Sequence, residues 1–293
     1  MYLRRLSLPT SFSEKYRLID CPPWCGMVDR RWHDDLTSSS GEKWIRLVGL
    51  LHSVVHPARS QRVLRWDSSA GGKPEAIWLK IYDNSSFIQR LARLLGCNKA
   101  TRAWENAWFL IGCSVATPRP VLALLSPWWR RQPEWLGFEE FSGSETFTLC
   151  YARHIRSGNG AEALVRSVGH FIAHLHQSNC WHRDLNGSNV LVRESAVDKF
   201  ELCLIDVNRM RHSDRMNQYK RVHDLVRLGL ARSDYAILLR AYEGVTGVVV
   251  DQQMLQRGLD HSQRLHAARK ANSYLRWWFK ITYHLGKIRN FRA

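Results

Sequence analysis

A short polar segment between two apolar stretches constrains this 293-residue chain more than any other feature. The segment runs from His182 to Asn189 and reads HRDLNGSN. Before it, residues 161–177 place apolar side chains at helical spacing, and after it Val190–Val192 form an apolar run typical of a short buried strand. We therefore predict a helix, a polar loop and a strand, with the charged side chains of the loop held at the edge of a core.

These residue types, at this spacing, are what phosphoryl transfer requires. In the loop pattern H-R-D-L-x-x-x-N, the Asp orients the attacking hydroxyl and accepts its proton, and the Asn binds a metal ion. We assign these roles to Asp184 and Asn189. A further metal-binding carboxylate is expected after a strand about 17 to 25 residues downstream, and Asp206 directly follows the apolar run Leu202–Ile205. The sequence therefore predicts ATP as the phosphoryl donor and Mg²⁺ held by Asn189 and Asp206.

Lys80 is the predicted cation for the nucleotide phosphates. It interrupts the apolar strand pattern Ala76–Tyr82, where a charged side chain is best explained if it faces a cleft. Kinases hold such a lysine with a glutamate from the next helix, so we expect an ion pair between Lys80 and Glu105. The backbone groups expected to hydrogen-bond adenine follow a later strand pattern and belong to Glu139, Glu140 and Phe141.

The order of these patterns predicts an α+β fold with two lobes. Residues 1–40 look irregular and are expected to form an extension that packs on the domain. Residues 41–139 combine strand patterns, including Trp44–Leu51, with a helical stretch at about 87–112, which predicts a smaller lobe of antiparallel sheet plus helix. Residues 140–293 are mostly helical in pattern and predict a larger lobe that ends in a basic helix.

Taken together, these features resemble the protein-kinase-like superfamily and, within it, the lipopolysaccharide core kinases that phosphorylate Kdo or heptose. The resemblance covers about residues 44–245 and is carried by ATRAWENAW with the following VATPRPV, by LHQSNCWHRDLNGSNVLV and by LIDVNRMR. It implies a two-lobed phosphotransferase that uses ATP and Mg²⁺ to phosphorylate a sugar hydroxyl of the lipopolysaccharide inner core. It also implies a cytoplasmic enzyme associated peripherally with the inner membrane of a Gram-negative bacterium.

The sequence departs from ordinary protein kinases in several places. No G-x-G-x-x-G occurs between Trp44 and Trp66, so the loop over the phosphates is expected near Pro57–Ser60. Trp78 stands where protein kinases keep a small residue beside adenine, and Asn186 where they often have a lysine. Val and Asn follow Asp206 in place of Phe and Gly, and no Ala-Pro-Glu comes after it. We therefore expect no peptide-docking activation segment.

The charge of the chain favours an anionic partner. Its formal net charge is +17, from 43 Lys and Arg against 26 Asp and Glu. The segment Arg276–Lys280 mixes Trp and Phe with cations, a combination that favours the interface of an anionic membrane. We expect an anionic glycolipid substrate and peripheral membrane contact, with Arg209, Arg211 and His212 as candidate contacts to the substrate. No dedicated nucleic-acid motif is present, so nucleic acid is not an expected partner.

Other sequence signals exclude some classes. The seven cysteines are odd in number and scattered, which argues against a disulfide framework, and Cys21 and Cys25 form an isolated pair that predicts zinc only weakly. The N-terminus lacks the apolar region of a secretory signal, and no run reaches the ~20 apolar residues of a membrane span.

Two alternatives stay open at this point. One is a small-molecule phosphotransferase of the aminoglycoside or choline type, although such enzymes usually carry Gly where Arg183 stands. The other is a membrane-associated pseudokinase that binds a partner without catalysis. The pseudokinase is disfavoured by the presence of Lys80, Asp184, Asn189 and Asp206.

Overall fold

The structure of the chain is a computed structural model that describes residues 14–21, 24–32, 61–68, 75–82, 98–127, 129–130, 133–157 and 161–271. They form two compact units. The first unit contains the described residues up to Leu164 together with Ser188–Arg211, and the second contains Val165–Gly187 and the residues from His212 onward. Four predicted segments lie outside the described residues: the strand at 44–51, the phosphate loop at 57–60, the first part of the helical stretch at 87–112, and the aromatic and basic segment at 276–280.

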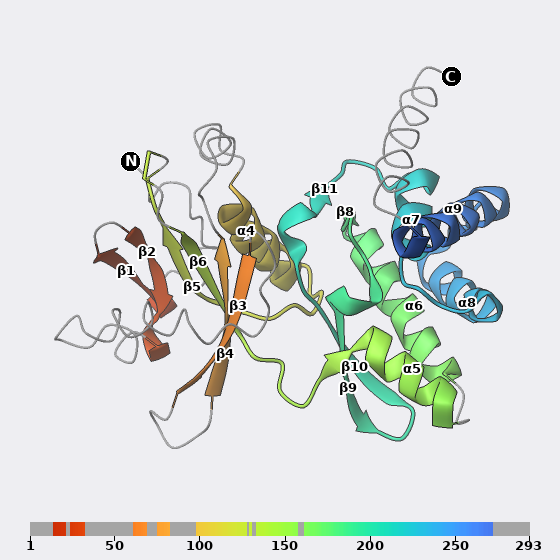
Figure 1. Ribbon diagram of the computed structural model, residues 1–293, viewed down its shortest axis with the longest axis horizontal. Coiled ribbons are helices and arrows are strands. Elements are labelled where there is room, and N and C mark those ends of the chain that lie inside the picture. Colours follow the sequence, from red (N-terminus) through yellow and green to blue (C-terminus); the bar gives the residue numbers. More distant parts are fainter. Residues whose placement is uncertain are drawn as a thin grey trace. The chain divides into compact units, whose positions relative to one another are not determined.

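The first unit contains a six-stranded antiparallel sheet, in the order β1-β2-β5-β6-β4-β3 (Figure 1). Its strands are β1 (Tyr16–Cys21), β2 (Trp24–Asp29), β3 (Gln61–Ser68), β4 (Glu75–Tyr82), β5 (Pro120–Leu125) and β6 (Glu134–Glu139). The antiparallel sheet was predicted, but the prediction of irregular structure for the first forty residues was wrong for β1 and β2. Their place in the sheet depends on the pairing of β2 with β5, about a hundred residues away, which no local pattern reveals.

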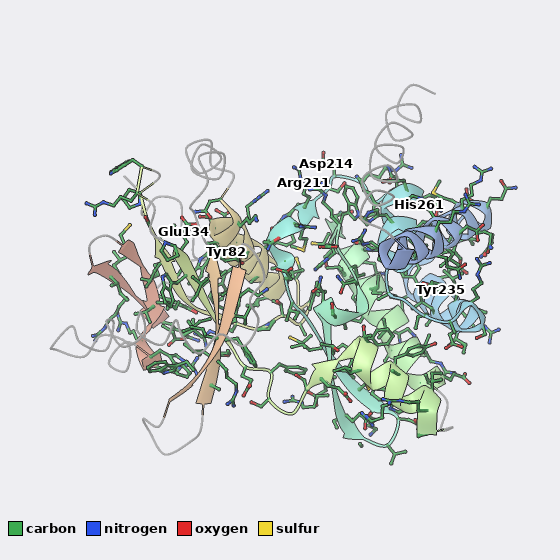
Figure 2. The ribbon with its side chains drawn as sticks, in the orientation of Figure 1. Tyr82, Glu134, Arg211, Asp214, Tyr235 and His261 are labelled. Atoms are coloured by element: carbon green, nitrogen blue, oxygen red, sulfur yellow. The ribbon has the colours of Figure 1, made fainter. Side chains whose placement is uncertain are left out.

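Helix α4 (Lys99–Gly112) packs on β5 and β6 and confirms the later part of the helical stretch predicted at 87–112. Asn98 caps it, because its side-chain oxygen accepts a hydrogen bond from the Ala100 N–H at 2.8 Å. The Asn98 amide also donates to the buried Glu134 on β6 at 2.7 Å. Glu134 lies opposite Tyr82 in the register of β6 and β4 (Figure 2). These contacts fix the start of α4 relative to the sheet.

The rest of the first unit forms a smaller three-stranded sheet and a helix. The sheet has the order β10-β9-β7, in which β9 and β10 pair as an antiparallel hairpin. The elements are β7 (Glu145–Thr146), α5 (Phe147–Ser157), η4 (Gly187–Asn189), β9 (Val190–Ala196), β10 (Lys199–Leu204) and η5 (Val207–Arg209). Helix η4 directly precedes β9, and η5 follows β10. Asn189 and Asp206, two of the residues predicted for the site, therefore lie at the beginning and the end of this hairpin.

The second unit is mainly helical, as predicted. Its elements are α6 (Glu162–Gln177), which begins in the first unit, β8 (Cys180–Trp181), β11 (Arg211–His212), α7 (Gln218–Leu225), η6 (Arg232–Asp234), α8 (Tyr235–Thr246) and α9 (Gln252–Ala271). Gly169 allows α6 and α8 to approach closely, because a Cβ at this position would lie 2.8 Å from the Leu238 carbonyl oxygen. Among the described helices, none is long and apolar enough to cross a membrane.

Candidate active site

Lys80 and Asp206, predicted for the same site, are in contact in the first unit. On β4, Leu79 and Ile81 are fully buried on one face of the sheet, so the alternation of the strand places Lys80 on the other face. The Lys80 Nζ lies 3.0 Å from Oδ1 of Asp206. The side chains are 17% and 27% exposed, so this ion pair remains accessible to small molecules.

The backbone around Asp206 is held in an unusual conformation. Asp206 has φ 58° and ψ 44°, the left-handed region, which is uncommon for residues other than glycine. Asn208 donates to the same Asp206 oxygen at 3.0 Å. Asn106 of α4 donates to the carbonyls of Val207 and Met210 at 2.7 and 3.2 Å, so η5 is tied to the helix. Such strain is often found at functional sites, where surrounding contacts keep it in place.

Asn189 lies on the backbone segment next to Asp206. Its carbonyl accepts a hydrogen bond from the Ile205 N–H at 2.9 Å, one residue before Asp206. Leu204, the residue before Ile205, donates its N–H to the Ala116 carbonyl at 2.9 Å. The Leu204 carbonyl accepts a hydrogen bond from the Thr117 hydroxyl at 2.8 Å. A carboxylate and an amide carried on adjacent segments offer oxygen ligands, which suit Mg²⁺ better than softer metals. These residues therefore fit the predicted metal.

The predicted ion pair between Lys80 and Glu105 was wrong. Lys80 pairs with Asp206, while Glu105 is exposed and has no ion pair among the residues that the structure describes. Partial desolvation of its carboxyl group by neighbouring side chains raises the pKa of Glu105. The reason is the rotation of α4: Asn106 faces η5, and each helical step turns about 100°, so Glu105 points elsewhere.

The expected adenine-binding backbone is partly engaged within the sheet. The Glu139 N–H donates to the Arg119 carbonyl, and the Glu140 N–H to the Ala76 carbonyl, both at 2.9 Å. These two donors therefore do not serve a base in this conformation. In the part of the chain that the structure describes, the Phe141 N–H donates no hydrogen bond, so Phe141 remains the predicted donor.

Trp78 is held on the same face of β4 as Lys80. Its indole N–H donates to Oε1 of Glu140 at 3.2 Å. Arg65, opposite Trp78 in the β3–β4 register, binds both oxygens of Glu140 at 2.7 and 3.0 Å. The hydrogen bonds from Arg65 lower the pKa of Glu140, so the group stays charged. This array fixes a large aromatic ring where a small residue would have left space.

In the second unit, a buried aspartate holds the backbone of the predicted catalytic loop. Asp224 on α7 accepts hydrogen bonds from the His182 and Arg183 N–H groups at 2.8 and 3.1 Å. Burial alone would raise the pKa of Asp224, but hydrogen bonds with His176 and His223 outweigh it, so the pKa lies below its usual range. Sequence reasoning missed Asp224, although an aspartate on the apolar face of a short helix was a signal.

Asp184 itself forms an ion pair with Arg227, which follows α7. Its side chain is 18% exposed and that of Arg227 is 37% exposed. The Asn186 N–H donates to the Asp184 carbonyl at 2.9 Å and tightens the loop. Arg227 was not predicted, since no motif marks it and its partner lies 43 residues earlier.

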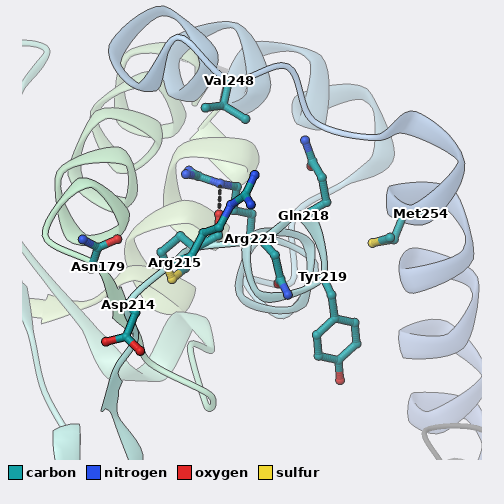
Figure 3. A pocket seen from close by; sticks show the side chains of 10 residues that line it. Asn179, Asp214, Arg215, Gln218, Tyr219, Arg221, Val248 and Met254 are labelled. Carbon is teal, nitrogen blue, oxygen red and sulfur yellow. Dashed lines mark hydrogen bonds between the residues drawn. The ribbon is translucent and has the colours of Figure 1, made fainter. Parts of the chain in front are cut away.

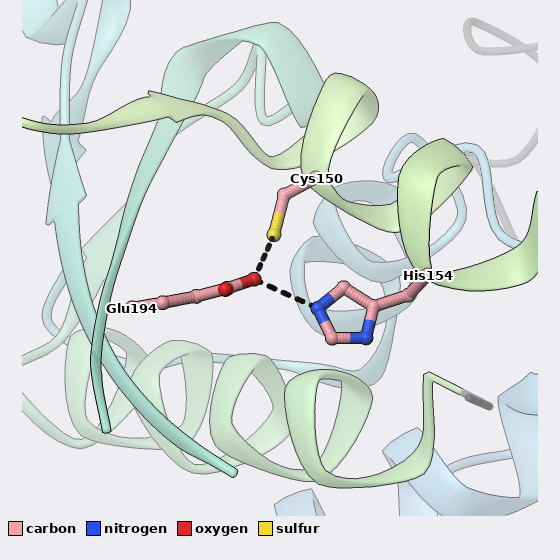
Figure 4. Close-up of side chains that lie close together, drawn as sticks. All are labelled: Cys150, His154 and Glu194. Atoms are coloured by element: carbon pink, nitrogen blue, oxygen red, sulfur yellow. Dashed lines mark hydrogen bonds and ion pairs between the residues drawn. The ribbon is translucent and has the colours of Figure 1, made fainter. Parts of the chain in front are cut away.

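Cys150, His154 and Glu194 form a separate cluster (Figure 4). None of these three residues was predicted for the site. Oε1 of Glu194 lies 2.8 Å from His154 Nε2 and 3.5 Å from Cys150 Sγ. The same oxygen accepts from Arg153 at 2.8 Å, and hydrogen bonds from Arg153 and His154 lower the pKa of Glu194 to about 2. Burial raises the pKa of the Cys150 thiol to about 12. The guanidinium of Arg153 already binds Glu194 in this cluster. The thiol and imidazole of the cluster are also not ligands that suit Mg²⁺.

Lys80 on a strand pairs with Asp206, which follows a later hairpin. In the second unit, the buried Asp224 anchors the loop that carries Asp184. These features define a protein-kinase-like phosphotransferase. The comparisons specify the family. The sequence model of the lipopolysaccharide kinase (Kdo/WaaP) family matches residues 65–242, and this chain belongs to that family. Its members are phosphotransferases that act on lipopolysaccharide, and ATP use follows from kinase membership. This favours the predicted sugar kinase over the aminoglycoside-type enzyme and the pseudokinase.

The structure of WaaP supports the kinase-like fold. The structure of WaaP in complex with acyl carrier protein is 19% identical in sequence, with a TM-score of 0.55. The match covers 77% of this chain and 95% of that chain. The BubR1 kinase domain, at 10% identity, covers 90% of this chain and 86% of its own with a TM-score of 0.46. No curated protein shows significant similarity to this sequence.

Proposed function

We propose that this enzyme transfers the γ-phosphoryl group of ATP to a hydroxyl of Kdo or heptose in the lipopolysaccharide inner core. The observation that carries the proposal is the contact between Lys80 and Asp206 beside the segment of Asn189. Family membership supplies the acceptor class. An anionic core glycolipid also suits a chain with a net charge of +17.

Lys80, Asn189 and Asp206 are the proposed donor-side residues. Bound Mg²⁺ would neutralise phosphate charge, and Asn189 and Asp206 would hold it through their oxygens. Lys80 already has a carboxylate partner, so it can exchange Asp206 for the α- and β-phosphates when nucleotide binds. The Asn208 amide would keep the Asp206 side chain oriented after that exchange.

Asp184 is the proposed group that orients the attacking sugar hydroxyl and accepts its proton. Arg227 pairs with it and holds the carboxylate in one orientation through a charge-assisted hydrogen bond. Because Asp224 fixes the N–H groups of the two preceding residues, the Asp184 backbone needs little rearrangement before reaction.

Trp78 is the proposed wall of the adenine site. It lies two residues before Lys80 on the same face of the strand, and Glu140 keeps its ring in place. In protein kinases a small residue at this position leaves a narrow slot for adenine. Here adenine would instead stack on the indole ring of Trp78. Phe141, the next residue after Glu140, would donate its N–H to the base.

The acceptor sugar can be assigned directly with the purified chain. It would be incubated with ATP, Mg²⁺ and dephosphorylated core oligosaccharides that end in Kdo alone or in Kdo plus heptose. Mass spectrometry would report the gain of one phosphate, and fragmentation would place it on one sugar. Phosphate on Kdo or heptose is the expected result. Product formation on an aminoglycoside or choline, with none on core sugars, would overturn the proposal.

Peripheral contact with the inner membrane remains part of the proposal, since the acceptor is anchored in a membrane. A vesicle flotation assay of the full chain tests it separately. We expect binding to vesicles that contain anionic lipid and none to neutral vesicles, with loss at high salt. Binding that ignores lipid charge would contradict it.

A further inference from the structure

The second unit contains a pocket of about 830 Å³ beside the first turn of α7 (Figure 3). It is formed by the residue before β8, the segment between β11 and α7, the connection of α8 with α9, and the start of α9. Figure 3 shows Asn179 and Asp214 on one side, Met254 on the other, and the side chains of Arg215 and Arg221 between them. None of these residues belongs to the donor-side machinery.

Two guanidinium groups in this pocket lack a carboxylate partner among the described residues. The Arg215 side chain is exposed and makes no hydrogen bond or ion pair in that part of the chain. Arg221 is half-buried and donates to the Met216 carbonyl at 3.2 Å and to the Tyr242 hydroxyl at 2.5 Å. Burial raises the pKa of Tyr242, so this hydroxyl stays neutral and does not cancel the charge. With two guanidinium groups against the single carboxylate of Asp214, the lining of the pocket keeps a net positive charge.

Groups suited to sugar hydroxyls lie beside these cations. The carboxylate of Asp214 and the side-chain amide of Asn179 make no hydrogen bond within the described residues, and both line the pocket. Tyr219 and Met254 add apolar surface. A pocket for free phosphate alone would gain nothing from a carboxylate, whereas a sugar acid or sugar phosphate uses both kinds of group.

We propose that this pocket binds the anionic part of the acceptor saccharide, a sugar that carries a carboxylate or a phosphate. The inference rests on the proposed function, because the acceptor class comes from it. It goes further by assigning Arg215 and Arg221 to the anion, and Asp214 and Asn179 to hydroxyl groups.

The pocket is tied to the predicted catalytic loop through α7. The first turn of this helix contributes Tyr219, whose ring contacts Trp181 edge-on at 6.2 Å. The second turn carries His223, 5.4 Å from the same Trp181 ring, and Asp224, which binds the loop backbone. The N–H of Ser213, the residue before Asp214, also donates to the Asn179 carbonyl at 2.9 Å. An acceptor bound here is thus held by the same helix that positions the loop of Asp184.

Direct binding and turnover of the full chain test this assignment. Titration calorimetry would measure binding of free Kdo, its uncharged methyl ester and inorganic phosphate to the wild type, Arg215→Ala and Arg232→Ala. Arg232 is an exposed arginine of the same unit outside the pocket, paired with Asp260. We expect Kdo to bind better than the ester, and Arg215→Ala to weaken Kdo about tenfold, with Arg232→Ala like the wild type.

The kinetic arm separates this site from the donor site. Arg215→Ala should raise KM for the core oligosaccharide about tenfold without a matching rise in KM for ATP, and Arg215→Lys should recover part of the loss. Equal Kdo binding by wild type and Arg215→Ala, or binding of phosphate without any sugar preference, would overturn the pocket assignment. If Kdo binding depends on Arg215 but no phosphate is transferred, the pocket stands and the proposed reaction fails.

Discussion

Lys80 and Asp206 are 126 residues apart in the chain, yet the Nζ of Lys80 lies 3.0 Å from Oδ1 of Asp206. One side chain comes from a central strand of the six-stranded sheet, and the other follows the hairpin of the smaller sheet. The contact brings the cation expected to bind nucleotide phosphates to the carboxylate expected to bind the metal. It is the structural basis for assigning the donor site to the first unit.

Replacing the aromatic wall should affect the base and not the phosphates. We expect Trp78→Ala to weaken ATP binding about tenfold, because stacking of a base on an aromatic ring contributes ~1–3 kcal/mol. Binding of Mg²⁺ tripolyphosphate, which has no base, should change little. Titration calorimetry with both ligands measures this, with Trp129→Ala as the control at an exposed tryptophan. Tighter ATP binding by Trp78→Ala would show that the indole blocks the base.

The ion pair of Arg227 with Asp184 should matter for turnover more than for stability. Arg227→Met removes a charged hydrogen bond worth ~1.5–3 kcal/mol, so kcat should fall roughly 10- to 100-fold. The melting temperature should stay close to that of the wild type, because Arg227 is 37% exposed. Arg232→Met alters an exposed arginine–aspartate pair of the same unit and should leave kcat unchanged. An equal loss in both variants would remove the special role of Arg227.

Asp224 should make stability fall in acid. Its pKa is lower in the folded chain than the ~3.9 of an unfolded aspartate, so the unfolded state binds this proton first as the pH falls. Its contribution is therefore complete above about pH 4 and is lost below it, toward the folded-state pKa. Urea unfolding of wild type and Asp224→Asn should differ by ~1.5–3 kcal/mol at pH 7 and less at pH 3. A difference that does not depend on pH would contradict this.

Packing of α6 against α8 depends on a glycine. Gly169→Ala would place a methyl group 2.8 Å from the Leu238 carbonyl oxygen and 2.9 Å from the Ala241 Cβ, so we expect a loss of ~1–3 kcal/mol. Gly244→Ala on α8 meets nothing within 4 Å and should gain up to about 1 kcal/mol through helix propensity. Urea unfolding measures both changes. Equal stability of the two variants would mean that the helices separate without cost.

Local signals account for the part of the site that was predicted. Three predicted features each depend on a few neighbouring residues. They are the loop that contains Asp184, the strand position of Lys80, and the apolar run that directly precedes Asp206. Helix α4 was also predicted from its apolar spacing. These features could be read from the sequence because motif spacing and strand or helix periodicity are properties of short segments.

The remaining features depend on contacts between distant segments. The rotation of α4, which turns Glu105 away from Lys80, is set by the bonds of Asn106 to η5 about a hundred residues later. The edge hairpin of β1 and β2 requires β5, and the engagement of the Glu140 N–H requires Ala76. The ion pair of Arg227 with Asp184 requires α7 to pack beside the loop that contains Asp184. None of these partners is visible in a window of sequence.

The most direct test follows the label of γ-³²P-ATP into core oligosaccharide, using wild type, Lys80→Met and Lys99→Met. Lys99 is an exposed lysine at the start of α4 and serves as the matched control. We predict Mg²⁺-dependent transfer by the wild type and Lys99→Met, and transfer at least a hundredfold slower by Lys80→Met with a nearly unchanged melting temperature. Transfer by Lys80→Met at the wild-type rate, or no labelled sugar from folded wild type that binds ATP, would contradict the account.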